Sequence, residues 1–559
     1  MKSTNLSPLQ KQRYLYQPKL PTTLRQAPDT IEAVEFAQES STAIPDAIKA
    51  IFPHADGKHP VRFGIMANEK KQQGKTKKAL KVGVILSGGQ APGGHNVIAG
   101  IFDGIQKINP DSELLGFSGG PSGLLTNTFV KIDSKMMDSY RNTGGFDMIG
   151  SGRTKISTPE QFKTALDNAT KNSLNALVII GGDDSNTNAA LLAEYFLQNN
   201  STVQVIGVPK TIDGDLKNDF IETSFGFDTA VKTYSELIGN IARDANSAKK
   251  YWHFIKVMGR SASHIALECA LQTQPNICLI SEEVKHTQQS LADIVKDICE
   301  VIAKRAEQKE NFGVIIVPEG LIEFIPEMNI LIGELNDLLS DSDFTQSAGQ
   351  DFSTQTTLLI KKLSEHSAEV FAELPQRIQE QLLMDRDPHG NVQVSRIETE
   401  RLLISMVESR LSEMKKEGTY KGTFSAQHHF FGYEGRCAFP SNFDADYCYS
   451  LGYTACLLIS QGFTGYISAI QNVHKPADAW VAGGVPLHSM MHIERRHGKD
   501  VPVIQKALVD LEGKPFKEFA KKRSDWAIHT SFIFPGAIQY YGPAEICDQP
   551  THTLRLEHS

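Results

Sequence analysis

Residues 81–96 read KVGVILSGGQAPGGHN, and this stretch decides the fold class. It begins with a short apolar run rich in Val and Ile and continues into glycines, after which apolar residues recur at helical spacing over 97–105. This order predicts a buried strand, a tight turn and a helix. Glycines let a backbone approach a phosphate, and the start of a helix offers free N–H groups. The turn is therefore either a phosphate-binding loop or a plain tight connection.

The same unit recurs along the chain. Further apolar strands are predicted at 176–180, 203–208, 253–258, 277–280 and 313–317, with helical patterns between them. Because largely apolar strands alternate with helices, we expect an α/β fold with parallel sheets covered on both faces. Ligands of such sheets bind beyond the carboxyl ends of the strands.

The rest of the 559 residues departs from this alternation. Residues 1–80 show no repeating pattern, and residues 331–429 are rich in Leu, Glu, Gln, Lys and Arg, which predicts a mostly helical insertion. We therefore expect four parts: an N-terminal extension at 1–80, one αβ domain from 81–225 and about 430–510, a second from 226–330 and about 511–559, and the insertion at 331–429.

Composition narrows the class of protein. The net charge of −8 argues against a nucleic-acid-binding protein, which more often has a pI above about 9. The seven cysteines include no C-x-x-C pair, and a sparse, odd number indicates reduced thiols. The chain shows no signal peptide and no apolar run of about 18 residues. We expect a cytoplasmic protein that binds neither nucleic acid nor membrane.

Two more loops follow predicted strands and carry carboxylates. Residues 181–188 read GGDDSNTN, where Asp183 and Asp184 suit a divalent cation, although helix capping alone would explain Ser185. Residues 209–216 read PKTIDGDL, which places one lysine and two aspartates within six residues. These three groups could act as base, phosphate clamp and orienting residue, or they could form an ordinary polar turn.

Three shorter motifs join glycine to a charged group: MGR at 258–260, PEG at 318–320 and YEGR at 433–436. Arg260 and Arg436 could hold a phosphate with paired N–H donors, and Glu319 could accept hydrogen bonds from sugar hydroxyls. Each motif alone is more consistent with a structural turn. Six such motifs at predicted strand ends favour a binding site.

Together, the six motifs resemble the phosphofructokinase family, and within it the long-chain, pyrophosphate-dependent subgroup. The resemblance covers about 80 to about 515, and the helical insertion matches that subgroup. It implies two Rossmann-like domains, a homodimer and Mg²⁺ as cofactor. It also implies reversible phosphorylation of fructose 6-phosphate by pyrophosphate, a step of glycolysis and gluconeogenesis.

The resemblance assigns roles to individual residues. Asp213 matches the general base, Asp183 the magnesium-site residue, and Gly88, Gly89 and Lys210 the pyrophosphate contacts. Lys250 and Tyr251 match a segment that reaches the sugar phosphate bound by the neighbouring subunit. Asp213 also counts among the fructose 6-phosphate contacts. The other contacts match Thr211, Ile212, Met258, Gly259, Arg260, Glu319, Tyr433, Glu434, Gly435 and Arg436.

The resemblance also implies that two positions, Asp184 and Lys210, decide the phosphoryl donor. ATP-using relatives typically have glycine where this chain has Asp184 and Lys210. A carboxylate at 184 would occupy the space of the nucleotide α-phosphate and repel it. Lys210 would supply a cation to the pyrophosphate and to the charge that develops during transfer, so both residues are expected to act in catalysis.

Three alternatives stay open at this point. The chain could be an ATP-dependent phosphofructokinase, which Asp184 and Lys210 argue against. It could act on another ketose phosphate, such as sedoheptulose 7-phosphate. It could also be a non-catalytic regulatory subunit, although such a subunit would be expected to lose Lys210, Asp213 or Asp215.

Overall fold

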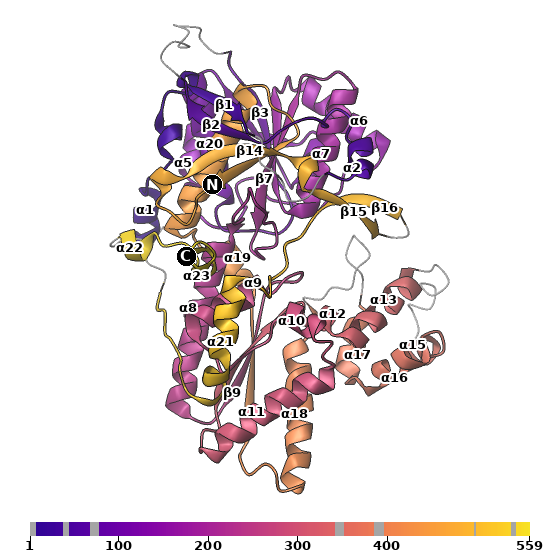
Figure 1. Cartoon of the computed structure of the whole chain (residues 1–559). Helices are drawn as coiled ribbons and strands as arrows, with labels where there is room; N and C mark the ends of the chain where they lie inside the picture. The colour runs from indigo at the N-terminus through magenta and orange to yellow at the C-terminus, as the bar shows by residue number, and fades with distance from the viewer. Residues whose placement is uncertain are drawn as a thin grey trace. The chain divides into compact units, whose positions relative to one another are not determined.

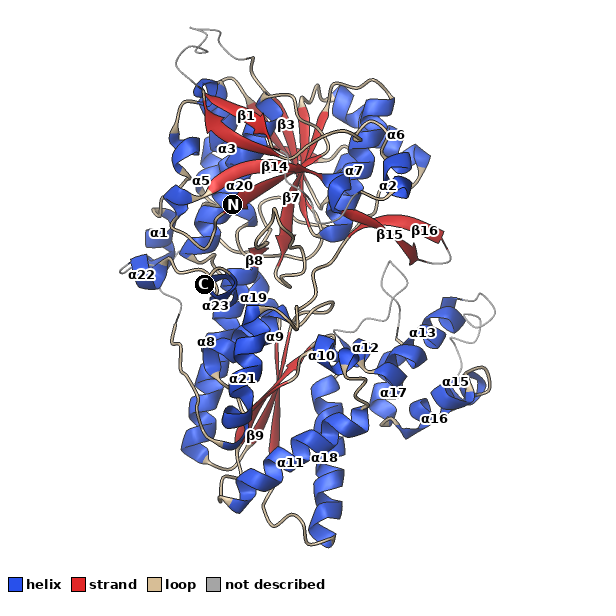
Figure 2. Cartoon of the chain, viewed as in Figure 1, coloured by secondary structure: helices blue, strands red, loops and turns tan. Residues whose placement is uncertain are grey.

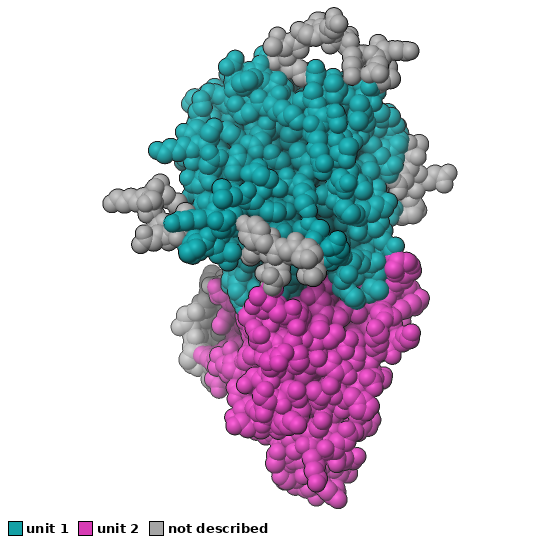
Figure 3. Space-filling model, turned by 90° about the vertical axis from the view of Figure 1, so that its left-hand side faces the viewer, with its two compact units in different colours: residues 1–233, 433–507, 538–558 teal, residues 234–432, 508–537, 559 magenta. Residues whose placement is uncertain are grey.

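The computed structural model describes residues 7–36, 44–66, 78–340, 352–384, 396–496, 499–537 and 544–559. The chain forms two compact units (Figure 3). Unit 1 contains residues 1–233, 433–507 and 538–558, and unit 2 contains residues 234–432, 508–537 and 559. Within the described ranges, no helix is both long enough and apolar enough to span a membrane.

Unit 1 is built on one sheet, with the order β1-β2-β14-β13-β7-β6-β3-β4-β5 and β8 paired to β7 (Figure 1). The five central strands, from β13 to β4, run parallel, and β8 also pairs parallel with β7, whereas β1, β2, β14 and β5 pair antiparallel with their neighbours. The strands are β1 (Ile31–Glu35), β2 (Val61–Ile65), β3 (Lys81–Leu86), β4 (Glu113–Phe117), β5 (Phe129–Ile132), β6 (Ala176–Gly181), β7 (Gln204–Thr211), β8 (Phe225–Gly226), β13 (Tyr466–Gln471) and β14 (Val481–Pro486).

Helices cover both faces of this sheet (Figure 2). The helix α3 packs along α20, because Gly100 and Gly452 let the two backbones touch: a Cβ on Gly452 would lie 2.1 Å from the Val97 carbonyl oxygen. A separate hairpin consists of β15 (Met491–Arg496) and β16 (Lys499–Ile504). The helices of unit 1 are α1 (Pro8–Tyr14), α2 (Asp46–Ile51), α3 (Gly94–Ile108), α4 (Pro121–Leu125), α5 (Ser134–Asp138), α6 (Pro159–Lys171), α7 (Asp183–Gln198), α19 (Tyr433–Cys437), α20 (Asn442–Ser460), α22 (Ala544–Cys547) and α23 (His552–Glu557).

Both ends of the chain join unit 1. The N-terminal segment adds β1 and β2 to the sheet, and buried Arg13 donates hydrogen bonds to Asn442 Oδ1 (2.6 Å) and to the Pro440 carbonyl (2.5 Å). Residues 538–558, which the sequence analysis grouped with the second domain, cluster instead with unit 1. There Leu554 is buried and Glu557 forms an ion pair with Lys217.

Unit 2 contains a smaller, wholly parallel sheet of order β10-β11-β9-β12. Its strands are β9 (Trp252–Val257), β10 (Ile277–Cys278), β11 (Gly313–Pro318) and β12 (Ala426–Phe431). Its helices include most of α8 (Phe227–Ala248), then α9 (His264–Thr273), α10 (Ser281–His286), α11 (Leu291–Glu307), α12 (Leu321–Phe324) and α21 (Lys514–Ile528). The parallel core of the larger sheet and the wholly parallel smaller sheet confirm the predicted α/β class.

The predicted insertion is mostly helical and shares a core with the rest of unit 2. Residues such as Phe371, Leu382 and Leu403 pack in one buried cluster with Trp252 and Phe254 of β9. The predicted range 331–429 ends inside a strand, β12, rather than in a helix. Its helices are α13 (Pro326–Ser340), α15 (Phe352–Ile360), α16 (Glu365–Glu373), α17 (Gln376–Leu382) and α18 (Thr399–Lys416).

A buried ion pair ties the insertion to the sheet. Lys256 of β9 places its Nζ 3.3 Å from Glu400 Oε2 of α18 and donates a hydrogen bond of 2.8 Å to the Ile397 carbonyl. Both side chains are buried, and the ammonium also lies 4.5 Å from the centroid of the Phe430 ring. Removing one member of such a pair leaves a charge without its partner in the interior.

We therefore expect Lys256→Ala to lower the free energy of unfolding of unit 2 by about 3–5 kcal/mol. Urea unfolding followed by circular dichroism measures this change. Arg410→Ala is the control, because its exposed ion pair with Glu413 on the same helix should contribute only about 0–1 kcal/mol. Equal losses in the two variants would contradict a structural role for the buried pair.

Candidate active site

The first and second predicted loops meet at the carboxyl ends of β3 and β6, which are neighbouring strands of unit 1. The Ser185 hydroxyl donates a hydrogen bond of 2.8 Å to the Ser87 hydroxyl. The Gly88 N–H donates to the Gly152 carbonyl (2.9 Å). These contacts hold the glycine loop 87–93 against the start of α7, so the strand-end arrangement expected from the sequence is present.

The third loop reaches the same place through Lys210. A Cβ built on Gly88, whose φ is +84°, would lie 3.2 Å from Lys210 Nζ. A Cβ on Gly89 would lie 3.1 Å from Arg436 Nη1. Glycine at both positions leaves the backbone open to a ligand, with two cationic side chains beside it. This pattern suits an anion such as a phosphate group.

Lys210 lies at the end of β7 and is buried. The pKa of its ammonium is lowered from 10.5 to about 8, first by burial and then by the nearby charge of Arg436, while Asp213 and Asp183 act in the opposite direction. Binding of an anion beside this lysine would stabilise the charged form of its side chain.

The carboxylates of the second and third loops lie close enough for their charges to influence one another. The pKa of Asp215 is raised from 3.8 to about 7, first by burial and then by the charges of Asp213 and Asp183. Asp183 lies in the first turn of α7, with Oδ2 3.4 Å from Lys506 Nζ. Asp184 follows it and is exposed. A concentration of carboxylates at one strand edge is typical of a site for a cation or a proton.

Asp213 has a buried carboxylate oxygen that is available to accept a hydrogen bond. Its N–H donates to the Thr211 hydroxyl (3.0 Å), and this contact orients the loop. Its Oδ1 is buried and makes no hydrogen bond to any residue that the structure describes. A buried carboxylate oxygen without a donor can accept one from a substrate hydroxyl.

The YEGR motif forms α19 in unit 1. Its Arg436 donates from Nη1 to the Gln90 carbonyl (3.3 Å) and so lies on the glycine loop. Tyr433 and Glu434 are exposed, and Gly435 is buried. Arg436 therefore joins the YEGR motif to the other loops of unit 1.

The MGR and PEG motifs come together in unit 2, at the carboxyl ends of the paired strands β9 and β11. The Gly259 N–H donates to Glu319 Oε2 (3.2 Å), and the Gly320 N–H donates to the Gly259 carbonyl (3.2 Å). A Cβ on Gly320 would lie 1.9 Å from the Arg260 carbonyl oxygen, which explains the glycine there. Met258 is buried beside them.

Lys250 and Tyr251 do not join this group. They precede β9, at the opposite end of the strand from Met258. The Lys250 ammonium lies 4.9 Å from the centroid of the Tyr251 ring, and Lys250 is exposed. Within unit 2, the sugar-phosphate contacts expected from the sequence therefore form two separate sets.

Two cationic residues near the loops of unit 1, Arg153 and Lys506, were not predicted from the sequence. Arg153 Nη2 lies 3.6 Å from the Cβ position of Gly89, and its charge contributes to lowering the pKa of Lys210. Lys506 lies beside Asp183. Neither residue directly follows a strand of the parallel core, so the strand-end pattern could not reveal them. A Gly-Arg pair at 152–153 was the one available signal for Arg153.

A doubly wound sheet with glycine loops, carboxylates and buried lysine at its strand ends defines a phosphoryl-transfer protein of the phosphofructokinase class. The family model described as Phosphofructokinase matches residues 81–459, and the chain belongs to this family.

Named relatives refine the comparison. The chain is 57% identical over 558 residues to the pyrophosphate–fructose 6-phosphate 1-phosphotransferase of Treponema pallidum, covering 99% of this chain and 97% of the relative. It is 53% identical to the protein of the same name from Porphyromonas gingivalis, covering 99% of each. A solved pyrophosphate-dependent phosphofructokinase from Marinobacter aquaeolei shares the fold, with a TM-score of 0.52 at 16% identity over 81% of this chain and 93% of that one.

Proposed function

We propose that this chain catalyses the reversible transfer of a phosphate group from pyrophosphate to fructose 6-phosphate, which gives fructose 1,6-bisphosphate and phosphate. This reaction belongs to glycolysis and gluconeogenesis. The observation that carries the proposal is the buried Lys210 beside the Gly88 backbone, with Asp184 at the start of the adjoining helix. The full-length relatives named for this reaction support the same choice.

Asp213 is the proposed general base. The oxygen of the sugar 1-hydroxyl attacks a phosphorus atom of pyrophosphate, and Asp213 accepts the proton of that hydroxyl. The bridging P–O bond breaks, and phosphate leaves with the bonding electrons. The buried Oδ1 of Asp213, which has no hydrogen-bond partner among the described residues, is the atom suited to accept this proton. In the reverse direction the same group returns the proton.

The cations of unit 1 are proposed to bind pyrophosphate and to stabilise the charge that develops during transfer. Lys210 and Arg436 lie against Gly88 and Gly89, and Arg153 lies near the same backbone. Because phosphoryl transfer depends on positioning and electrostatic stabilisation, these side chains are the expected main contributors. Keeping Lys210 with Asp213 and Asp215 also argues against a non-catalytic regulatory subunit.

Magnesium fits the carboxylates of this site. Asp183 offers hard oxygen ligands at the start of α7, within electrostatic reach of buried Asp215, and already attracts the Lys506 ammonium to 3.4 Å. We assign Mg²⁺ to Asp183. When bound with pyrophosphate, the ion would neutralise part of the negative charge of the donor.

The fructose 6-phosphate contacts are proposed to be the residues that the sequence comparison assigned. In unit 2, Arg260 would hold the sugar phosphate and Glu319 would accept hydrogen bonds from hydroxyls. Lys250 and Tyr251, set apart at the other end of β9, fit a contribution to the site of a second subunit, so we propose a homodimer. Sedimentation-equilibrium ultracentrifugation measures this state.

The cytoplasm is the proposed location. The six cysteines whose environment the structure describes are all free thiols, and five of them are buried. Thiols without disulfides are typical of proteins from a reducing compartment.

A parallel assay with the two donors tests the proposed function. The purified protein with fructose 6-phosphate and Mg²⁺ is expected to turn over with pyrophosphate and to show little activity with ATP. Coupled detection of fructose 1,6-bisphosphate measures both rates. Turnover with ATP and none with pyrophosphate would overturn the proposal and restore the ATP-dependent alternative. Sedoheptulose 7-phosphate as acceptor tests the remaining substrate question.

The pH dependence of kcat/KM for pyrophosphate should follow the loss of the positive charge of Lys210. Its pKa is lowered from 10.5 to about 8, so its positive charge is present below that pH and is lost above it. We expect kcat/KM for pyrophosphate to fall as pH rises through about 8, since this parameter reports the free enzyme. Lys210→Arg keeps the charge and should move the fall to higher pH. An unchanged profile in that variant would assign the titration to another group.

A further inference from the structure

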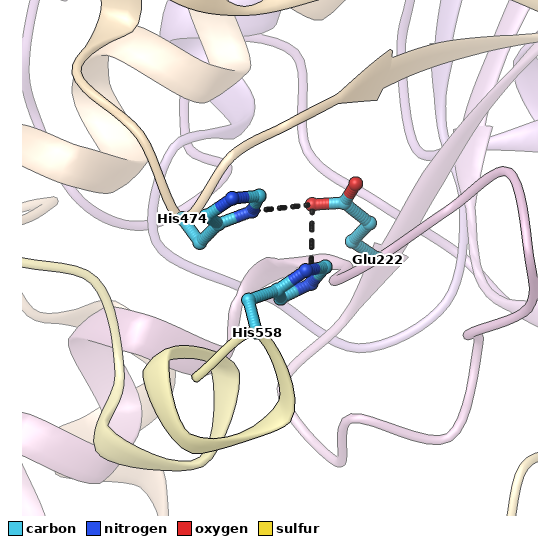
Figure 4. Close-up of side chains that lie close together, drawn as sticks. All are labelled: Glu222, His474 and His558. Carbon is cyan, nitrogen blue, oxygen red and sulfur yellow. Dashed lines mark ion pairs between the residues drawn. The ribbon is translucent and has the colours of Figure 1, made fainter.

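A cluster of two histidines and one glutamate lies outside the proposed active site, in unit 1. Glu222 belongs to the loop after β7, His474 to the loop after β13, and His558 to the tail after α23 (Figure 4). One ligand atom from each residue lies within 4.8 Å of those of the other two. Figure 4 shows the three side chains converging from these separate segments.

Glu222 is held in place for this arrangement. Its Oε1 accepts the Asn472 N–H (2.8 Å), and its Oε2 accepts the Val473 N–H (2.9 Å). The carboxylate is thereby fixed to the same loop that presents His474. Each oxygen keeps further lone pairs that a cation could use.

The two imidazoles complete the donor set. His474 Nδ1 lies 3.9 Å and His558 Nε2 lies 3.8 Å from Glu222 Oε2. His474 Nδ1 is buried and makes no hydrogen bond to any residue in the described ranges. A buried ring nitrogen without a hydrogen-bond partner is unusual, and coordination of a metal ion would satisfy it.

We propose that Glu222, His474 and His558 form a site for a divalent transition metal of the Zn²⁺ class, with water at the fourth position. Two imidazoles and one carboxylate are a donor set that zinc uses, whereas Mg²⁺ prefers oxygen ligands alone. The bound ion would fasten the C-terminal helix α23 to the loops after β7 and β13.

Binding requires one ring to turn. The His474 and His558 rings are stacked, with centroids 3.9 Å apart and an interplanar angle of 11°, and an ion cannot lie in the plane of both. His558 is exposed and lies just after the end of α23, so its ring can rotate about the Cβ–Cγ bond at little cost. Such a rotation would point its nitrogen at the space beside Glu222 Oε2.

The experiment titrates untagged, full-length protein with Zn²⁺ against a chromophoric chelator, in excess Mg²⁺. We expect one Zn²⁺ per chain and at least a tenfold loss of affinity in His558→Ala. His552→Ala, at the start of the helix α23 that precedes His558, is the matched control and should bind like the unchanged protein. His474→Ala should reproduce the loss, with circular dichroism reporting whether that variant is folded.

Two further readouts decide the outcome independently of enzymatic activity. Co²⁺ in place of Zn²⁺ should give visible d–d absorption that disappears in His558→Ala. Amide hydrogen exchange in residues 552–558 should slow on adding Zn²⁺ to the unchanged protein but not to that variant. Equal Zn²⁺ affinity in His558→Ala, or no competition with the chelator by the unchanged protein, would overturn the proposal.

Discussion

Asp213→Ser is expected to lower kcat by about 10²–10⁴-fold, the usual contribution of a general base. The variant removes the buried carboxylate oxygen that is suited to accept the proton of the sugar hydroxyl. Serine keeps a small polar side chain, so the loop that Thr211 orients through the Asp213 N–H should persist. Binding of fructose 6-phosphate should stay measurable by isothermal titration calorimetry.

Asp219→Ser provides the matched control. Asp219 is exposed in the same 212–224 loop and loses an equal charge when replaced. Its kcat should stay within about twofold of the unchanged enzyme, as expected for a surface substitution away from the chemistry. If Asp213→Ser retained near-normal turnover, the base would have to be another group, and Asp215 would be the next to test.

Substitutions at Lys210 and Asp184 should change which phosphoryl donor, pyrophosphate or ATP, the enzyme uses. Lys210→Gly should lower kcat with pyrophosphate by about 10²–10³-fold, the range seen when one electrostatic stabiliser of a transition state is removed. Asp184→Gly should leave most pyrophosphate activity and relax the exclusion of ATP weakly. The double variant should show the largest shift toward ATP, because it removes both the repelling carboxylate and the cation placed for pyrophosphate.

The ratio of kcat/KM for the two donors, measured in all four proteins, tests this expectation. Because Asp184 is exposed in the first turn of α7, Asp184→Asn is a useful control that keeps the size of the side chain but removes its charge. A large effect of glycine with none of asparagine would assign the exclusion to size. The same donor ratio in the double variant and the unchanged protein would show that other residues select the donor.

The strand-end loops of unit 1 could be predicted because the apolar strands β3, β6 and β7 are each followed within two residues by a glycine or an aspartate. In a parallel sheet, neighbouring strands bring such loops to one edge. Arg153 and Lys506 could not be predicted in this way. They approach from segments outside the parallel core, and their closeness to Gly89 and Asp183 depends on tertiary packing.

The chain ends were also beyond sequence reasoning. The strands β1 and β2 are short antiparallel additions at the edge of the sheet, and each has only five residues in which a pattern could show. The C-terminal helix α23 has six residues, and its place in unit 1 rests on one buried leucine and on polar contacts such as the Lys217–Glu557 pair. Contacts of this kind leave no periodic pattern in the sequence.

The sheet of unit 1 draws its strands from both ends of the chain, with β13 and β14 encoded after the whole of 234–432. During synthesis, β7 therefore leaves the ribosome long before its neighbour β13 exists. At about 5–20 residues per second, the interval is on the order of ten to fifty seconds. Throughout it, one edge of β7 and the face of α3 that later contacts Gly452 stay uncovered. We expect nascent chains to need chaperone protection during this interval.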